Sequence, residues 1–303
     1  CYFTGATSAT FNRLEKLGYV TLSTRPALRC RDLKPAKLEG PLVLNEEQEA
    51  ARAGLQARMD REEPGVALLY GITGSGKTAV YLKLIQSCLD KGKSALLLVP
   101  EISLTPQLLS LLAAYFGDRV AVLHSSLSAG ERYDQWKRVR AGNASVVVGT
   151  RSAVFAPCEN LGLLILDEEQ EHTYKSENNP RYHARETAIW RGARQKALVL
   201  LGSATPSVET MYRARTGVYG LYTLKERYTG MKLPQVDIVD MKEELKAGND
   251  GTLSEPLYLA LRENLQAGQQ TVLFLNRRGT SRMAVCVDCG YVPECPRCSF
   301  HMT

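Results

Sequence analysis

Six short apolar runs constrain the fold of this chain more than any other feature of its sequence. They occupy residues 66–70, 95–100, 120–124, 145–150, 161–169 and 197–203. Runs without polar alternation are typical of parallel strands that are buried on both faces, and the helical stretches between them supply crossover connections. The sequence therefore predicts an α/β fold with a doubly wound, parallel sheet.

The composition is that of a globular protein. The 303 residues are 44% hydrophobic and 23% charged, and no apolar run approaches the roughly 20 residues that a transmembrane helix needs. The net charge of +6 permits a polyanionic partner but does not demand one. The first residues lack the basic and apolar regions of a signal peptide, and we expect the chain to be a fragment of a longer protein. Four of the eight cysteines are scattered singly, which favours the reducing cytoplasm.

The sequence divides into five segments. Residues 1–31 combine an amphipathic helical stretch, a glycine and a β-like stretch, which resembles the end of a winged helix, although any helix–strand pair would look similar. Residues 32–41 form a polar linker with two prolines, and residues 42–230 hold the α/β domain. Residues 231–283 form a connection followed, at 270–281, by a strand that could open a second α/β domain. Residues 284–303 begin a cysteine-rich region.

The strongest chemical signal lies between the first apolar run and the helical stretch that follows it. The sequence there reads GITGSGKT, the G-x-x-x-x-G-K-T pattern of a phosphate-binding loop. Glycines let backbone N–H groups turn inward around phosphates, Lys77 can reach the β- and γ-phosphates, and the Thr78 hydroxyl can bind Mg²⁺. The predicted nucleotide-binding residues of this loop are Gly71, Thr73, Gly74, Ser75, Gly76, Lys77 and Thr78.

Three acids at the end of a later strand supply the partner that such a loop needs. We expect Asp167 to hold Mg²⁺ and Glu168 to orient the water that attacks the nucleotide, with Lys77 as the third catalytic residue. A solvated acidic loop is the alternative interpretation. Ser203 and Thr205, at the end of another buried strand, are expected to line the same crevice.

Two further strand ends indicate a surface for a nucleic-acid backbone. Ser103 and Gln107 follow one strand, and Thr150 and Arg151 follow another. Their hydroxyl, amide and guanidinium groups could bind phosphates, although helix N-capping would explain some of these residues equally well.

Four cysteines near the end of the chain form two C-x-x-C pairs. Zinc is favoured over a redox role because the motif is paired. One shared site or two sites that await further ligands both fit the spacing. The expected ligands are Cys286, Cys289, Cys295 and Cys298.

In this order, the motifs GITGSGKT, LDEEQ, GSATPS and NRRG resemble those of superfamily 2 helicases. The segments LVPEISLTPQ, GTRSAVFAP, YKSENNPRYHARETA and CGYVPECPRC narrow the resemblance to the primosomal protein N-prime (PriA) family of bacterial replication-restart helicases. The resemblance covers nearly the whole chain. It implies a RecA-like fold for the first lobe, the start of a second RecA-like lobe, and 3′-to-5′ DNA unwinding driven by ATP.

The resemblance also implies residue roles and partners. Gln48 would contact adenine, and an aromatic-rich loop after the acids would sense single-stranded DNA and report it to the ATP site. Two zinc ions would be completed by cysteines outside this chain. Forked and single-stranded DNA, primosome-loading proteins and single-stranded DNA-binding protein would be partners of a monomeric protein. The loop residues that would carry the sensing role are Tyr174, Tyr182, His183 and Arg185.

One residue departs from the family pattern. The family usually reads D-E-E-H, whereas position 170 here is Gln, which cannot be protonated but keeps a donor and an acceptor. Coupling between ATP and DNA is therefore open to change. The resemblance also implies later helicase motifs that lie outside this chain, so we do not expect the chain alone to unwind DNA. The alternative function is a zinc-stabilised module that binds forks and recruits partners, with weak or no motor activity.

Overall fold

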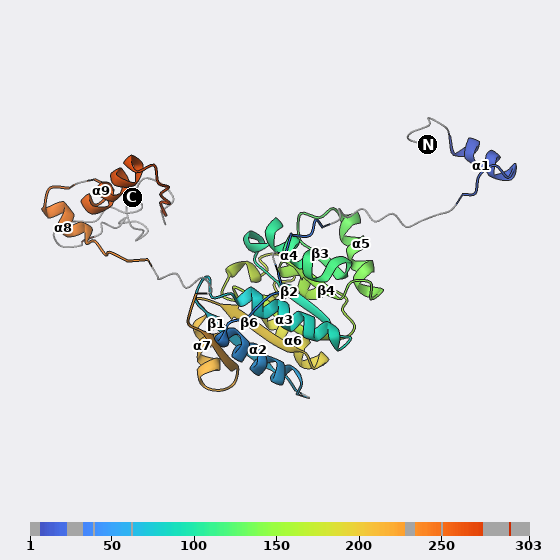
Figure 1. Ribbon diagram of the computed structural model, residues 1–303, viewed down its shortest axis with the longest axis horizontal. Coiled ribbons are helices and arrows are strands. Elements are labelled where there is room, and N and C mark those ends of the chain that lie inside the picture. Colours follow the sequence, from blue (N-terminus) through green and yellow to red (C-terminus); the bar gives the residue numbers. More distant parts are fainter. Residues whose placement is uncertain are drawn as a thin grey trace, which may run out of the picture. The chain divides into compact units, whose positions relative to one another are not determined.

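The computed structural model describes residues 7–22, 33–38, 40–61, 63–227, 234–249, 251–274 and 291. The chain separates into two compact units, residues 1–232 and residues 233–303. Figure 1 shows the sheet and its flanking helices in the first of these units. Within the described ranges, no helix has both the length and the apolar character that crossing a membrane requires.

A seven-stranded sheet organises the first unit, and every pair of neighbouring strands is parallel. The order across the sheet is β3-β4-β2-β5-β6-β1-β7. The non-sequential order requires crossovers on both faces, so the predicted doubly wound α/β fold is confirmed. The strands are β1 Val66–Gly71, β2 Ser94–Leu98, β3 Val120–Leu123, β4 Val146–Gly149, β5 Leu161–Asp167, β6 Leu198–Ser203 and β7 Gly220–Leu224.

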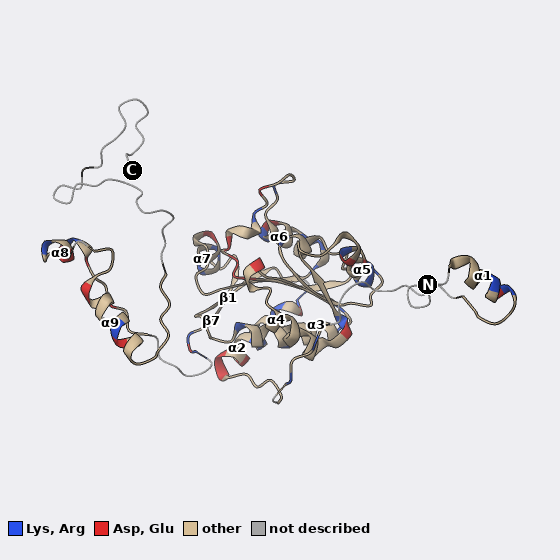
Figure 2. Cartoon of the chain, turned by 90° about the horizontal axis from the view of Figure 1, so that it is seen from above, with Lys and Arg blue, Asp and Glu red and all other residues tan. Residues whose placement is uncertain are grey.

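Helices cover both faces of this sheet (Figure 2). One layer contains α2 (Glu46–Met59), α3 (Lys77–Asp90) and α4 (Pro106–Phe116). The opposite layer contains α5 (Ala129–Arg140), α6 (Ala184–Gln195) and α7 (Val208–Arg215). Short 3₁₀ helices lie in the connections, at Glu101–Ser103, Gly117–Arg119, Arg151–Phe155 and His172–Tyr174.

The core consists of two apolar layers that share the central strands. Along β5, Leu163 packs toward the layer of α2, α3 and α4, whereas Leu164 packs toward the layer of α5, α6 and α7. Both residues are fully buried, as are their partners on β2, Ala95 and Leu96. Burial on both faces explains why these strands are apolar at consecutive positions.

The six predicted apolar runs all form strands, but β7 has no such run. It lies at the edge of the sheet beside β1, and only Leu224 of its residues is buried. Contacts with α2 hold the strand in place. The Tyr222 hydroxyl donates to the Gly54 carbonyl at 3.0 Å, and the Glu47 carboxylate accepts the N–H groups of Lys225 and Glu226. A half-buried edge strand needs less apolar surface and therefore leaves a weaker sequence signal.

The remaining described segments are short. Helix α1 (Ser8–Lys16) confirms the predicted helix near the start, and residues 19–22 after it form no strand. In the second unit, α8 (Met241–Lys246) and α9 (Glu255–Gln266) are joined through Glu244, whose carboxylate accepts the Glu255 N–H at 2.6 Å. Of the predicted strand at 270–281, the structure describes only residues 270–274, which pair with no neighbouring strand.

Gly149, the last residue of β4, lies in close contact with the backbone of β3. A methyl group at this position would overlap the Leu123 carbonyl oxygen and approach Ala153 Cβ to 2.6 Å. We expect Gly149→Ala to lower the free energy of unfolding by about 2 kcal/mol, because neighbouring backbone would have to move. Urea denaturation followed by circular dichroism measures this change. Gly40→Ala is the control, because its methyl group would meet no atom within 4 Å; equal midpoints for the two variants would contradict the prediction.

Candidate active site at the carboxyl edge of the sheet

The predicted phosphate-binding loop joins the end of β1 to the start of α3. Gly74 and Gly76 have φ values of 80° and 78°, in the left-handed region that glycine favours. The Lys77 ammonium group donates to the Gly71 carbonyl at 2.9 Å, so the lysine lies across the loop that it follows in sequence. This conformation places a cation and several backbone N–H groups at one point of the sheet edge.

The loop fits the phosphates of a nucleotide. Helix α3 begins without a side-chain cap, whereas α2, α4 and α5 are capped by Asn45, Thr105 and Ser128. Its first N–H groups therefore remain available to an anion. The Ser75 hydroxyl is buried and has no hydrogen-bond partner in the described structure. An uncapped helix start beside an unpaired hydroxyl is consistent with ATP as the ligand.

Gln48 supports this loop from α2. Its side chain is fully buried and uses both ends of its amide within the protein. The oxygen accepts the Asn45 N–H at 3.0 Å, which completes a capping box, and the nitrogen donates to the Ser75 carbonyl at 2.8 Å. Gln48 thus links the start of α2 to the phosphate-binding loop, and its contact with adenine stays a prediction.

Asp167, the last residue of β5, is oriented by a residue that the sequence analysis missed. The Tyr81 hydroxyl, from α3, donates to Asp167 Oδ1 at 2.9 Å. Burial raises the pKa of Asp167, and the charge of Glu168 acts in the same direction, while the Tyr81 hydrogen bond and Lys77 oppose them. A buried carboxylate of this kind is stabilised as an anion by a nearby cation. Mg²⁺ fits this requirement, with Asp167 and Thr78 as the residues that would hold it.

Tyr81 could have been found from its spacing. It follows Lys77 by one helical turn, so the two side chains lie on the same face of α3. Space for its hydroxyl exists because residue 202 on β6 is glycine, where any Cβ atom would overlap the Tyr81 oxygen.

Glu168 and Gln170 begin a chain of hydrogen bonds that leads to β6. Glu168 has a φ of 47°, an uncommon value for a residue with a side chain. The Gln170 amide donates to the Glu168 carboxylate at 2.9 Å, and its oxygen accepts the Ser203 hydroxyl at 2.6 Å. The Thr205 N–H donates to the same hydroxyl at 2.9 Å. The structure thereby places the predicted site residues Glu168, Ser203 and Thr205 close together, with Gln170 between them.

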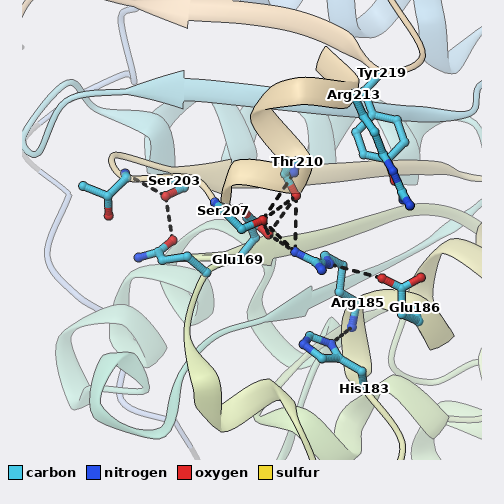
Figure 3. A network of polar contacts seen from close by, with 11 residues as sticks. Glu169, His183, Arg185, Glu186, Ser203, Ser207, Thr210, Arg213 and Tyr219 are labelled. Carbon is cyan, nitrogen blue, oxygen red and sulfur yellow. Dashed lines mark hydrogen bonds and ion pairs between the residues drawn. The ribbon is translucent and has the colours of Figure 1, made fainter. Parts of the chain in front are cut away.

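The third acid, Glu169, has a different environment (Figure 3). Its side chain is fully buried and forms an ion pair with Arg185 at 2.7 Å. It also accepts the Ser207 N–H at 2.7 Å and the Thr210 hydroxyl at 3.1 Å. Because all these partners belong to the protein, Glu169 anchors structure rather than binding a ligand.

The aromatic-rich segment after the acids is held tightly against them. Tyr174 is 1% exposed, and its hydroxyl donates to the Asp167 carbonyl at 2.7 Å. The ring of Tyr182 packs edge-on against Phe155, with 4.8 Å between the centroids. His183 caps α6 by accepting the Arg185 N–H at 3.2 Å. Burial and the charge of Arg185 lower the pKa of His183, which favours the neutral ring whose nitrogen accepts this hydrogen bond.

These positions change what the four loop residues can do in this conformation. Stacking on a base requires an exposed ring, whereas the Tyr174 ring is enclosed by protein. Arg185 donates to Glu169, Ser207 and Thr210, so its guanidinium group is largely committed. Direct DNA contact by these residues stays a prediction, and the structure gives Tyr174 and Arg185 a linking role that the sequence did not reveal.

A groove of about 500 Å³ lies at the carboxyl ends of β2 and β4. Thr150 and Arg151, two of the predicted DNA-binding residues, line it together with Tyr174. The Arg151 guanidinium donates to the carbonyls of Thr173 and Lys175 at 3.1 and 2.5 Å, which fixes the aromatic segment to the groove. The sequence analysis missed Glu101, Ser125 and Arg132, which also line it.

The other predicted site residues lie apart from this groove or outside the described part of the chain. Ser103 is half-buried at the end of a 3₁₀ helix, and Gln107 is exposed in the first turn of α4. The predicted zinc ligands fall outside the described residues, namely Cys286, Cys289, Cys295 and Cys298.

Comparison with known proteins places this geometry in a family. The family model "DEAD/DEAH box helicase" matches residues 54–214, more than half of the chain. The chain is 48% identical to the replication restart protein PriA of Bacillus subtilis over 305 residues, covering 100% of the chain and 38% of that protein. It is 42% identical to PriA of Synechocystis, covering 98% of the chain and 36% of that protein. The chain thus spans less than two fifths of the length of these relatives.

A solved structure agrees with the sequence comparison. RecG bound to a three-way DNA junction matches 75% of this chain and 28% of the RecG chain, with a TM-score of 0.54 and 25% sequence identity. The predicted resemblance to PriA proteins is confirmed, and the chain belongs to the DEAD/DEAH box helicase family.

Proposed function

We propose that this chain carries the first RecA-like lobe of a replication-restart DNA helicase that hydrolyses ATP and moves 3′ to 5′. The observation that supports this most directly is the hydrogen-bonded connection of the acids to three neighbours. Asp167 is bonded to α3 through Tyr81 and to the aromatic segment through Tyr174, and Glu168 is bonded to β6 through Gln170. Through these hydrogen bonds, a structural change at the DNA surface can be transmitted to the acids.

Each side chain has a defined task in hydrolysis. When bound, ATP would supply the phosphoryl group that is transferred to water, and Mg²⁺ would neutralise the charge that develops on this group. Lys77 would leave the Gly71 carbonyl to neutralise phosphate charge, and Thr78 and Asp167 would hold the metal ion. Glu168 would accept a hydrogen bond from the attacking water and orient it. Tyr81 keeps the Asp167 carboxylate in one orientation, which reduces the reorganisation needed during reaction.

The groove beside the aromatic segment is the proposed DNA surface. Arg151 and Thr150 lie on its wall, and Arg151 is bonded to the backbone on both sides of Tyr174. A DNA backbone that binds Arg151 competes with those carbonyls and can shift the segment. Because the Tyr174 hydroxyl is bonded to Asp167, the shift reaches the acids directly.

The wider role rests on the relatives. The replication restart proteins that this chain resembles are more than twice its length. We extend from them the preference for forked DNA, the primosome-loading and single-stranded DNA-binding partners, the cytoplasmic location, the monomeric state and two zinc ions. The domain boundaries of the sequence analysis are retained in this proposal. A zinc-stabilised recruiting module without motor activity is the competing function, and it would not need the Gln170 connection.

Lys77→Ala tests the nucleotide site. We expect DNA-stimulated ATP hydrolysis by the full-length protein to fall at least about 100-fold, because a charged donor to the reacting phosphates is lost. Lys83→Ala, on the same helix, is the matched control and should change the rate less than twofold. Undiminished DNA-dependent hydrolysis by Lys77→Ala would remove the basis for a motor and favour the recruiting module.

Gln170→Leu tests the connection between Glu168 and Ser203. The substitution keeps similar volume but removes two hydrogen bonds, each with a net value of about 1 kcal/mol. We expect about a tenfold loss of DNA-stimulated kcat with a change in the KM for ATP below about twofold. Gln170→His, which retains a donor and an acceptor, is the control and should keep most of the activity. Equal losses for both variants would show that volume, rather than hydrogen bonding, matters at this position.

Tyr174→Phe tests the link from the aromatic segment to Asp167. Loss of one hydroxyl leaves the ring in place but frees the Asp167 carbonyl, at a cost of about 1 kcal/mol. The stimulation of ATP hydrolysis by single-stranded DNA should fall about fivefold, while the rate without DNA changes little. Tyr182→Phe in the same segment is the control and should retain stimulation. If the rate without DNA falls by the same factor, the Tyr174 hydroxyl supports Asp167 in hydrolysis itself and does not link it to DNA.

A further inference from the structure

Residues of α5 and α6 line a second concave surface. Both helices lie on the sheet face that α7 also covers (Figure 2). This α5–α6 groove has a volume of about 630 Å³, and the segment that leads from the 3₁₀ helix Arg151–Phe155 into β5 also lines it. Both tryptophans of the chain, Trp136 and Trp190, line it as well. Neither residue was part of the predicted site.

Each helix presents the same pair of side chains to the groove. On α5, the Arg140 guanidinium lies 5.1 Å from the centre of the Trp136 ring, and on α6, Arg194 lies 5.0 Å from that of Trp190. In both pairs the arginine follows the tryptophan by four residues, so one helical turn places the cation over the ring. Each pair therefore offers an aromatic surface beside a positive charge.

The groove is aromatic and positively charged. Phe155 adds a third ring that is 54% exposed, and Trp190 is 60% exposed. Arg191 is a third cation, although its guanidinium donates to the Val154 carbonyl. Glu159 is the one acid among the lining residues. Three cations against one carboxylate favour an anionic ligand, and the rings favour a ligand with flat, unpaired surfaces.

The α5–α6 groove and the groove at the carboxyl edge share one structural element. The 3₁₀ helix Arg151–Phe155 lines both, with Arg151 in the edge groove and Phe155 in the α5–α6 groove. Phe155 also packs against Tyr182 of the aromatic-rich segment. This continuity connects the second surface to the proposed DNA surface.

We propose that the α5–α6 groove is a second contact for single-stranded DNA, continuous with the edge groove; this rests on the proposed function of the edge groove. Bases stack on Trp136, Trp190 and Phe155, and phosphates bind Arg140 and Arg194. Stacking of this kind is independent of sequence and requires unpaired bases. An acidic protein segment would match the charge equally well, but it would not account for the shared 3₁₀ helix.

The geometry sets a minimum length for the strand. A 3₁₀ helix rises about 2 Å per residue, so the four steps from Arg151 to Phe155 separate the two grooves by about 8 Å. A stacked strand advances about 3.4 Å per nucleotide, so roughly two to three nucleotides join the two surfaces. An oligonucleotide that is confined to the edge groove should therefore leave the tryptophans unaffected.

Tryptophan fluorescence tests the proposal without a label, because both emitters lie in the α5–α6 groove. The probes are oligothymidylates of about 2 nucleotides, too short to join the two grooves, and about 16 nucleotides, titrated into the 303-residue chain without ATP at about 0.1 M salt. We expect the longer probe to quench the tryptophan emission. The probe concentration at half-maximal quenching should equal the concentration at half-maximal binding measured by fluorescence anisotropy. Binding of the longer probe without quenching would overturn the proposal, as would quenching by polyglutamate alone, which would indicate an acidic protein partner.

Variants separate the groove from the motor. Trp190→Ala should weaken binding of the longer probe at least about fivefold, because stacking of each base on an aromatic ring contributes substantially to the binding free energy. Arg194→Glu should weaken it by a similar factor, whereas Arg215→Glu, an exposed residue of α7, should change it less than twofold. Equal effects of the two charge reversals would overturn the proposal. Quenching in Lys77→Ala should persist, so failure of the groove and failure of the ATP site remain distinguishable.

Discussion

A buried negative charge governs how the carboxyl edge of this sheet is arranged. The Glu169 side chain has no exposed surface, and a carboxylate without water must be neutralised and hydrogen-bonded. Arg185 supplies the positive charge, and Ser207 and Thr210 complete the hydrogen bonds. Because these partners belong to α6 and to the start of α7, one carboxylate fixes the end of β5 to both helices. Removing one partner from such a pair typically costs about 3–5 kcal/mol, so this edge is firmly held.

The three consecutive acids have different tasks because the backbone sends their side chains in different directions. Asp167 ends the strand, Glu168 turns with a positive φ, and Glu169 points into the protein. Two tyrosines flank the first acid: Tyr81 holds its carboxylate and Tyr174 its carbonyl. Asp167 is therefore the point at which the phosphate-binding helix and the aromatic-rich segment meet.

The sequence predicted the features that depend on local patterns. Six strands were found because burial on both faces requires consecutive apolar residues, and the phosphate-binding loop was found because its glycines and lysine have fixed spacing. Edge strand β7 and the role of Tyr81 were missed, since each depends on contacts between segments distant in sequence. An aromatic residue in a polar segment looks the same whether its ring faces solvent or protein. The family resemblance therefore implied DNA sensing by Tyr174, although its ring is buried.

Gln170 shows why one departure from a family pattern is compatible with an intact site. The position must donate to Glu168 and accept from Ser203 at the same time, and a primary amide satisfies both requirements. A neutral histidine could also do so, but its second nitrogen would gain a proton near pH 6.5 and lose its ability to accept. The amide does not titrate, so the link from Glu168 to Ser203 keeps its direction across the physiological pH range. The connection from Glu168 to Ser203 therefore depends on geometry and not on a protonation state.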